Sequence, residues 1–321
     1  METSKHNAPF FIVGSERSGT TLLRVMLDAH PRLHIPRESH FINELLSIYY
    51  PEKTLQANEI LDAFELIKSQ KRWQEWRVDN DTVVRQLKTF HSLTLAAFID
   101  LLFTHVTLLE KKSRWGDKTP NYILQIDKIK RIFPEAKFIH VVRDARDVCL
   151  SLLEKGWHGE WLREIAGRWA STVMAGRNQG SEIGPDSYIE ISYEDLVTDS
   201  KATLQRICDF LGEKYFDTML SFYETVDGKV ADREANAHKK LARAPKLSDI
   251  ERWKKEMSLL QITTVESVAG SAMELFNQQK KFTGLLQIIP MTFRLLFLLS
   301  DISLPLRKKL GIHFPSLKGK L

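Results

Sequence analysis

Cysteine is scarce in this sequence, because its 321 residues include only Cys149 and Cys208. Two cysteines provide neither a disulfide framework nor the spacing of a metal-binding motif. The first residues, METSKHNAPFF, also lack the long apolar core of a secretory signal peptide. These absences predict a protein of the reducing cytoplasm.

A strong charge of one sign is absent too. The 46 basic and 41 acidic residues leave a net charge of +5, which is a mild basic excess. Such an excess suits anionic ligands or a membrane surface and does not argue for nucleic acid. The length allows one large domain or two ordinary ones, and the sequence contains no internal repeat or low-complexity segment.

A long uninterrupted apolar run is missing even from the apolar tail, residues 285–306, which read LLQIIPMTFRLLFLLSDISLPL. Three residues interrupt this run: Pro290, Arg294 and Asp301. A membrane-spanning helix is therefore not expected. We divide the chain into a folded domain, 1–283, and an apolar and basic C-terminal segment, 284–321. Peripheral membrane contact through 284–309, packing on the domain, and binding of a partner are the alternatives for this segment.

The sequence is most informative in residues 9–30, PFFIVGSERSGTTLLRVMLDAH. The apolar run 10–13 predicts a buried strand, and Gly14 ends it. From Thr20 onward apolar residues recur at helical spacing, which predicts a helix. A glycine-bounded loop between strand and helix directs backbone N–H groups and the positive end of the helix dipole to one point, which suits an anion.

This loop almost matches the phosphate-loop pattern G-x-x-x-x-G-K-[ST], because Gly14 and Gly19 are correctly spaced. Thr20 stands where the pattern has lysine, and Thr21 follows it. A nucleotide triphosphatase needs that lysine for its β- and γ-phosphates. Arg17 is the main cation here, so we expect a shorter anion. A nucleotide or small-molecule kinase of the phosphate-loop type is the disfavoured alternative.

Strand-like runs alternate with helices along much of the chain. Further strands are expected at 137–142 and 187–192, while 113–120, SRWGDKTP, is expected to break the pattern as a short loop. The alternation predicts an α/β fold, with a phosphate-loop-NTPase-like parallel sheet flanked by helices and with helical insertions. Ligands bind at the carboxyl ends of the strands in such sheets. Four side chains are expected to converge there: Arg17, Lys118, Arg143 and Tyr193.

A second anion site is predicted where the strand 137–142 runs into a helix. Arg143 and Ser151 lie eight residues apart across this junction. A phosphate there would meet a guanidinium, a hydroxyl and a helix N-terminus together. Two anion sites on neighbouring strands predict a nucleotide that is phosphorylated in two places.

Three stretches together, RSGTTLLRVMLDAHP, KTP and VVRDARDVCLS, resemble the sulfotransferases that use 3′-phosphoadenosine 5′-phosphosulfate. The similarity is closest to the branch with the protein-tyrosine sulfotransferases and bacterial relatives, and it covers roughly residues 9–253. The resemblance implies transfer of a sulfuryl group from this donor to a hydroxyl acceptor: tyrosine, carbohydrate, lipid or small metabolite. A non-catalytic nucleotide-binding scaffold is the alternative from another class.

The resemblance also implies a role for individual residues. The 5′-phosphosulfate would be held by Arg17, Ser18, Gly19, Thr20 and Thr21. The 3′-phosphate would be held by Arg143 and Ser151, with Lys155 one helical turn further on. Tyr193 matches a tyrosine near the nucleotide, and Arg252 with the basic segment 237–246 matches a flap over it. Glu16 and Ala145 depart from the residues that the family usually has at these positions.

Sulfuryl transfer is an in-line displacement that spreads negative charge over oxygen atoms, so positioning and cations should supply most of the catalysis. Arg17 and Lys118 are the candidate cations, and no metal is expected. A hydroxyl acceptor also needs a base, for which Glu38 is the family match. His34 and His40 are the alternatives, whereas His140 is expected to be a core residue.

Overall fold

The computed structural model describes residues 8–155, 161–225 and 239–281. The chain divides into two compact units. The first unit comprises Met1–Val141 and Ala175–Leu247, and the second comprises Val142–Met174 and Ser248–Leu321. Residues 284–321, the predicted C-terminal segment, lie outside the described residues, as does the first part of the predicted flap.

A five-stranded sheet forms the centre of the first unit, with the strand order β2–β5–β1–β6–β7. The strands are β1 (Phe10–Gly14), β2 (Leu33–His34), β5 (Arg114–Lys118), β6 (Lys137–Val142) and β7 (Tyr188–Ser192). β1 is parallel to both β5 and β6, and β2 is parallel to β5. The predicted parallel sheet is therefore confirmed. Its central strand is β1, the strand that leads into the anion loop.

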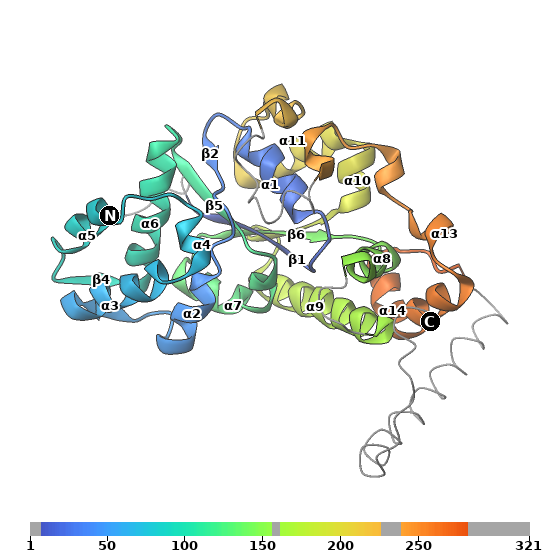
Figure 1. The fold of residues 1–321 in the computed structure, drawn as a ribbon, viewed down its shortest axis with the longest axis horizontal. Helices are drawn as coiled ribbons and strands as arrows, with labels where there is room; N and C mark the ends of the chain where they lie inside the picture. The colour runs from blue at the N-terminus through green and yellow to red at the C-terminus, as the bar shows by residue number, and fades with distance from the viewer. Residues whose placement is uncertain (1–7, 156–160, 226–238, 282–321) are drawn as a thin grey trace, which may run out of the picture. The chain divides into compact units, whose positions relative to one another are not determined.

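Helices cover both faces of this sheet (Figure 1), with α1 and α11 above it in this view and α7 below. The helices of the first unit are α1 (Thr20–Asp28), α2 (Phe41–Ile48), α3 (Ala57–Lys68), α4 (Lys71–Gln74), α5 (Asn80–Leu87), α6 (Leu95–Leu109), α7 (Ile126–Ile132), α10 (Tyr193–Thr198) and α11 (Ser200–Leu211). A small antiparallel pair, β3 (Thr54–Gln56) and β4 (Ser92–Thr94), lies within the predicted helical insertion. Short 3-10 helices occur at Pro120–Leu124, Asp217–Met219, Phe222–Thr225 and Lys239–Ala242.

The main core of the first unit packs against one face of the sheet. Phe11 stacks on Phe138 at 5.4 Å between ring centroids and meets Trp115 edge-on at 5.9 Å. Side chains from the insertion helices continue the same core, among them Phe41, Phe64 and Phe103. Because strand side chains alternate between faces, Phe10 and Ile12 serve the opposite face. The insertion is thus anchored to the sheet by apolar burial.

The prediction that residues 113–120 form a loop was wrong, because Arg114–Lys118 is a fully buried strand. Its polar residues hide it from a hydrophobicity pattern. Arg114 pairs with Glu213 at 3.0 Å and donates to the carbonyl of Ala8 at 2.7 Å. At Gly116 a Cβ atom would lie 2.4 Å from the Phe10 ring, so no side chain fits there. Tertiary partners, Glu213 and Glu38, balance the charges of Arg114 and Lys118 in this buried strand.

The second unit is helical, and α9 (Leu162–Ile183) begins in it and ends in the first unit. Its other helices are α8 (Ala145–Lys155), α13 (Trp253–Glu256) and α14 (Leu259–Leu275), with a 3-10 turn at Leu247–Asp249. Its core joins α8, α14 and the start of α9 through side chains such as Val148, Trp169 and Val265. Within the described residues, no helix has both the length and the apolar character required to cross a membrane.

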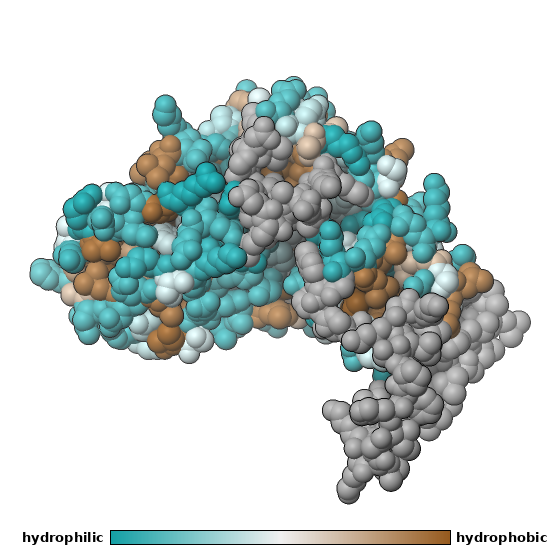
Figure 2. Space-filling model, in the orientation of Figure 1, coloured by the Kyte–Doolittle hydropathy of each residue, from teal (hydrophilic) through white to brown (hydrophobic). Residues whose placement is uncertain are grey.

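Both cysteines are buried, Cys208 in the first unit and Cys149 in the second. Burial raises the pKa of each thiol, that of Cys208 to about 12. On the surface, Figure 2 shows mostly hydrophilic residues over the described part of the first unit, with separate hydrophobic spots between them. Scattered apolar side chains of this kind are normal on a folded protein.

Candidate active site

The anion loop curls between β1 and α1 as the sequence predicts. Arg17 and Gly19 both have positive φ angles, 64° and 89°. Gly19 is the N-cap residue of α1, and no side chain hydrogen bond caps this helix end. Glycine has no side chain that could cap these backbone N–H groups, and the N–H groups of a first helical turn are the usual basis of anion binding at a helix N-terminus. Glu16, the departure from the family pattern, is exposed to solvent.

Ser18 supplies the clearest sign that the loop fits a polar ligand. Its side chain is completely buried, yet its Oγ atom has no hydrogen-bond partner among the described residues. A buried hydroxyl without a partner carries a free-energy cost. An oxygen atom of a bound anion would remove that cost. The role of Ser18 in holding the 5′-phosphosulfate stays a prediction.

Tyr193 packs directly on this loop. It begins α10 at the end of β7, and its ring lies so close to Gly19 that a Cβ atom there would be 2.1 Å from the ring. Gly19 is therefore required for two reasons, its positive φ and this contact. The structure thus brings together Tyr193 and the loop, two features that the sequence predicts near one nucleotide.

Lys118 joins the loop to the candidate base. It ends β5, is only 2% exposed, and donates to the Thr21 hydroxyl at 3.1 Å. Its ammonium also forms an ion pair with Oε1 of Glu38. Thr21, Lys118 and Glu38 come from α1, β5 and the segment after β2. Three predicted site residues are therefore in direct contact.

Glu38 is neutralised from two sides. Its Oε1 atom faces Lys118, whereas Oε2 lies 2.9 Å from His40 Nε2 and 3.1 Å from the guanidinium of Arg72 on α4. Burial alone would raise the pKa of Glu38, but Lys118, the hydrogen bond with His40 and the charge of Arg72 together hold it well below its usual range. Arg72 is a member of the site that sequence spacing did not indicate, since it is one of several cations in the helical insertion.

The other two histidines lie in separate networks. His34 contacts Asp28 at 3.1 Å, and Asp28 also pairs with Lys112. His140 is fully buried, with its Nδ1 atom 2.6 Å from the hydroxyl of Tyr188. Burial lowers the pKa of His140 to about 4, against the carboxylate of Glu190, which raises it. His140 is a core residue, as predicted, and among the three histidines considered only His40 contacts Glu38 in the described structure.

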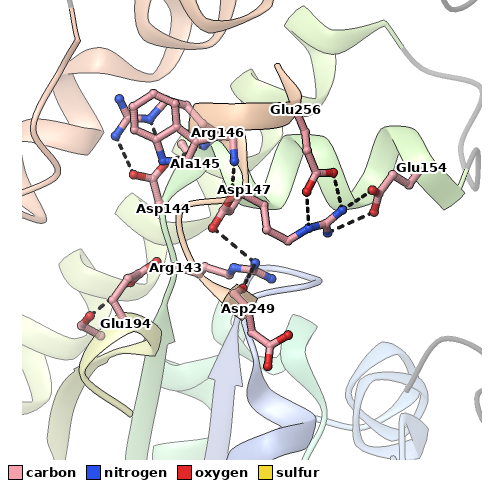
Figure 3. Close-up of polar contacts among 12 residues, drawn as sticks. Arg143, Asp144, Ala145, Arg146, Asp147, Glu154, Glu194, Asp249 and Glu256 are labelled. Carbon is pink, nitrogen blue, oxygen red and sulfur yellow. Dashed lines mark hydrogen bonds and ion pairs between the residues drawn. The ribbon is translucent and has the colours of Figure 1, made fainter. Parts of the chain in front are cut away.

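Arg143 lies in the second unit, immediately after β6, and Figure 3 shows its surroundings. Its guanidinium lies 3.4 Å from the carboxylate of Asp147 and donates to the carbonyl of Asp249 at 3.1 Å. Ser151 is buried on α8, and Lys155 follows four residues later on the same helix. Residues four apart share a helix face, so Ser151 and Lys155 are placed to act together.

Arg252 is held by two carboxylates in this structure. Its guanidinium pairs with both Glu154 and Glu256, which are labelled in Figure 3, and the shortest contact to Glu256 is 2.7 Å. Arg252 would have to exchange these partners to bind a phosphate. Its predicted role stays a prediction.

Arg146, in the RDARD motif at 143–147, is a second residue whose role the sequence did not predict. It contacts Asp144 at 2.6 Å and Glu266 at 2.7 Å, and its guanidinium lies 3.5 Å from the centre of the Trp253 ring. Arg146 is therefore a structural anchor for the segment that carries Arg143. The repeated Arg–Asp pairs in the motif could have suggested such a division of roles.

Comparison with known proteins agrees with this geometry. The sequence profile of the sulfotransferase family matches residues 9–217. Protein-tyrosine sulfotransferase A of Caenorhabditis elegans is 26% identical over 69% of this chain and 54% of its own length. The omega-hydroxy-beta-dihydromenaquinone-9 sulfotransferase of Mycobacterium bovis is 23% identical over 74% of this chain and 71% of its own length.

The fold is also shared with a solved structure, the sulfotransferase domain of the Synechococcus PCC 7002 olefin synthase. Its TM-score is 0.56 at 23% sequence identity, and the match covers 82% of this chain and 95% of the domain. The chain spans about half the length of the first of the two relatives above. The profile, however, matches more than half of the residues of this chain. The chain therefore belongs to the sulfotransferase family.

Proposed function

We propose that this protein transfers a sulfuryl group from 3′-phosphoadenosine 5′-phosphosulfate to a hydroxyl group by in-line displacement. The observation that carries the proposal is the contact of Lys118 with both Thr21 and Glu38, next to the anion loop. Lys118 is a buried cation that contacts the start of α1, where the sulfate would bind, and a carboxylate that can accept a proton. Membership of the sulfotransferase family supports the same reaction.

The first unit supplies groups that suit the phosphosulfate. The N–H groups at the start of α1 and the buried hydroxyl of Ser18 would bind its oxygen atoms. An ammonium has three N–H donors, so the contacts of Lys118 to Thr21 and Glu38 leave one for the sulfonate. With Arg17, it would stabilise the charge that develops on the sulfonate and on the leaving phosphate.

Glu38 is the proposed base. As the new O–S bond forms, the acceptor hydroxyl must lose its proton, and the S–O bond to the 5′-phosphate breaks with its electron pair on the phosphate. Glu38 is ionised at neutral pH because its pKa lies below the ordinary range. It is therefore in the correct protonation state to accept the proton.

The acceptor class is proposed from the chemistry of the base and from the names of the relatives. A carboxylate base suits any neutral hydroxyl, and the two named relatives are called a protein-tyrosine sulfotransferase and a hydroxymenaquinone sulfotransferase. We propose a phenolic or alcoholic hydroxyl on a peptide, lipid, carbohydrate or small metabolite.

The test is incubation of the full chain with donor labelled in its sulfuryl group, together with phenol, a tyrosine-containing peptide, a long-chain alcohol and cell fractions. We expect label in an acceptor and release of adenosine 3′,5′-bisphosphate. Turnover should survive excess chelator if Arg17 and Lys118 supply the required charge. Phosphoryl transfer from ATP that depends on magnesium would support a kinase instead. Nucleotide binding without any transfer would support a scaffold.

A further inference from the structure

The two oxygen atoms of Glu38 have different partners. Oε1 meets Lys118, which also contacts Thr21 at the start of α1. Within the described part of the chain, Oε2 meets residues that do not belong to the loop, His40 just before α2 and Arg72 on α4. His40 and Arg72 therefore hold the carboxylate through Oε2, and Oε1 faces Lys118 beside the loop. A surface glutamate that merely balanced charge would need no such division.

His40 reaches Glu38 at the expense of an unfavourable backbone conformation. Its φ is 55° and its ψ is −26°, in the left-handed region that is uncommon for residues other than glycine, although histidine is enriched there with asparagine and aspartate. Such a conformation costs of order 1 kcal/mol or more and persists where other contacts over-determine it. The imidazole of His40 contacts Oε2 of Glu38 at 2.9 Å. The strained backbone conformation therefore occurs at His40, the residue that contacts the candidate base.

Arg72 contacts the same oxygen of Glu38, Oε2, from another element, α4. Its side chain is 27% exposed and reaches inward to Oε2 at 3.1 Å, whereas Lys71, its neighbour on α4, is exposed. Other charged groups also face Glu38, namely Lys118 and the buried Asp117 on β5. Removing Arg72 leaves those groups in place, so its contribution can be measured separately.

We propose that Arg72 and His40 are positioning residues that hold Glu38 by Oε2, so that Oε1 is the atom that takes the proton of the acceptor hydroxyl. The inference rests on the proposed role of Glu38 as the base. In this arrangement the proton passes from the acceptor O–H to Oε1, which has a second lone pair for its contact with Lys118, while the third N–H of Lys118 faces the sulfonate. No other group changes its bonding on the base side of the reaction.

The first experiment compares Arg72→Ala with Lys71→Ala, using phenol and 4-nitrophenol as acceptors at mildly alkaline pH. Phenol is neutral there and needs a base, whereas 4-nitrophenol is largely ionised and does not. We expect Arg72→Ala to lower kcat for phenol roughly 10- to 100-fold, the range for a misplaced catalytic group, and to change kcat for 4-nitrophenol little. Lys71→Ala should leave both unchanged. Equal losses with the two phenols, or a higher KM alone, would overturn the proposal.

The second experiment uses the backbone of His40. His40→Gly relieves the positive φ but removes the imidazole. We expect its melting temperature to stay at or near that of the parent protein while kcat for phenol falls about 10-fold or more. A variant with full activity would show that His40 serves only the local fold.

The third experiment needs no acceptor. Carbon-13 labelling of glutamate side chains and titration by NMR should show a higher pKa for Glu38 in Arg72→Ala, because one cation beside the carboxylate is lost. An unchanged pKa of Glu38 would contradict the proposed ion pair between Arg72 and Glu38. If the parent protein transfers no sulfuryl group at all, the proposed function fails while this titration still tests the pairing. If Glu38→Gln is inactive but Arg72→Ala behaves like Lys71→Ala, only the present inference fails.

Discussion

Two acids that lie close to Lys118, the partly buried Glu38 and the fully buried Asp117, have pKa values shifted in opposite directions. Lys118, His40 and Arg72 outweigh the burial of Glu38 and lower its pKa. Asp117, the residue before Lys118, is completely buried, and burial raises its pKa to about 6 against the hydroxyls of Ser39 and Thr119, which lower it. The surroundings of Glu38 thus favour its ionised form, whereas those of Asp117 favour its protonated form.

The behaviour of Asp117 leads to a prediction about stability. Because its pKa is higher in the folded protein than the ordinary 3.8, the unfolded chain ionises first as the pH rises. The free energy of unfolding should therefore fall between about pH 4 and pH 6, by roughly 3 kcal/mol for this one group. Asp117→Asn should flatten the profile and be more stable than the parent at pH 7. Chemical denaturation across this range measures it.

Asp62→Asn, at an exposed position of α3, is the matched control and should keep the parent's pH profile. A profile for Asp117→Asn that parallels that of the parent would show that Asp117 does not carry the effect.

Glu38→Gln tests the proposed base directly. The amide keeps the size of the side chain but does not accept a proton at neutral pH. We expect kcat to fall about 10²- to 10⁴-fold, the usual worth of a general base, with little change in donor affinity. Steady-state kinetics with phenol and calorimetry with adenosine 3′,5′-bisphosphate give the two quantities. His34→Ala, which alters the separate Asp28 network, should retain far more activity. The reverse result would assign the base to His34.

At the scale of elements, the contact between the anion loop and α10 is the most sensitive to a single methyl group. Gly19→Ala adds a Cβ atom both at a φ of 89° and against the ring of Tyr193. We expect it to destabilise the protein by about 1–3 kcal/mol and to weaken donor binding, because the loop must move. Thermal unfolding and nucleotide calorimetry measure the two effects.

Gly184 provides the control, since its φ is 80° and an added Cβ atom would meet nothing within 4 Å. Gly184→Ala should show only the backbone cost and bind nucleotide normally. In a Gly19→Ala, Tyr193→Ala double variant, removal of the ring should recover part of the lost stability. Identical behaviour of the two glycine variants would mean that the ring contact is unimportant.

The sequence predicted those elements whose signals are local. The strand 10–13, the glycine-bounded loop and the helix from Thr20 are adjacent in sequence, so periodicity and spacing suffice. The strand Arg114–Lys118 was missed because its burial depends on distant partners such as Glu213. The grip of Arg72 on Glu38 is likewise a tertiary contact, between residues that no motif connects. Elements with local sequence signals could be predicted, whereas the ion pairs between distant residues could not.

At the scale of the whole molecule, the sequence predicts two anion sites, the anion loop and the pair Arg143 and Ser151. If both sites bind phosphate groups of one nucleotide, the protein should prefer adenosine 3′,5′-bisphosphate to adenosine 5′-phosphate. Arg143→Ala should remove most of that preference, at about 1.5–3 kcal/mol for a charged hydrogen bond.

Calorimetry with the two nucleotides gives this preference. Lys255→Ala, which removes an exposed charge from α13, should leave it intact. Equal affinities of the parent protein for the two nucleotides would contradict the division of the donor between two phosphate sites.

The two buried cysteines have a practical consequence. Thiol reagents attack the thiolate, and burial raises the pKa of both native thiols while shielding them from solvent. A cysteine introduced at an exposed position should therefore react selectively in the folded protein. Since both native thiols are shielded, neither cysteine has to be replaced before labelling, in the first unit or in the second. A pair of spectroscopic labels, at Asp62 in the first unit and Lys255 in the second, could then follow the distance between the units as nucleotide is added.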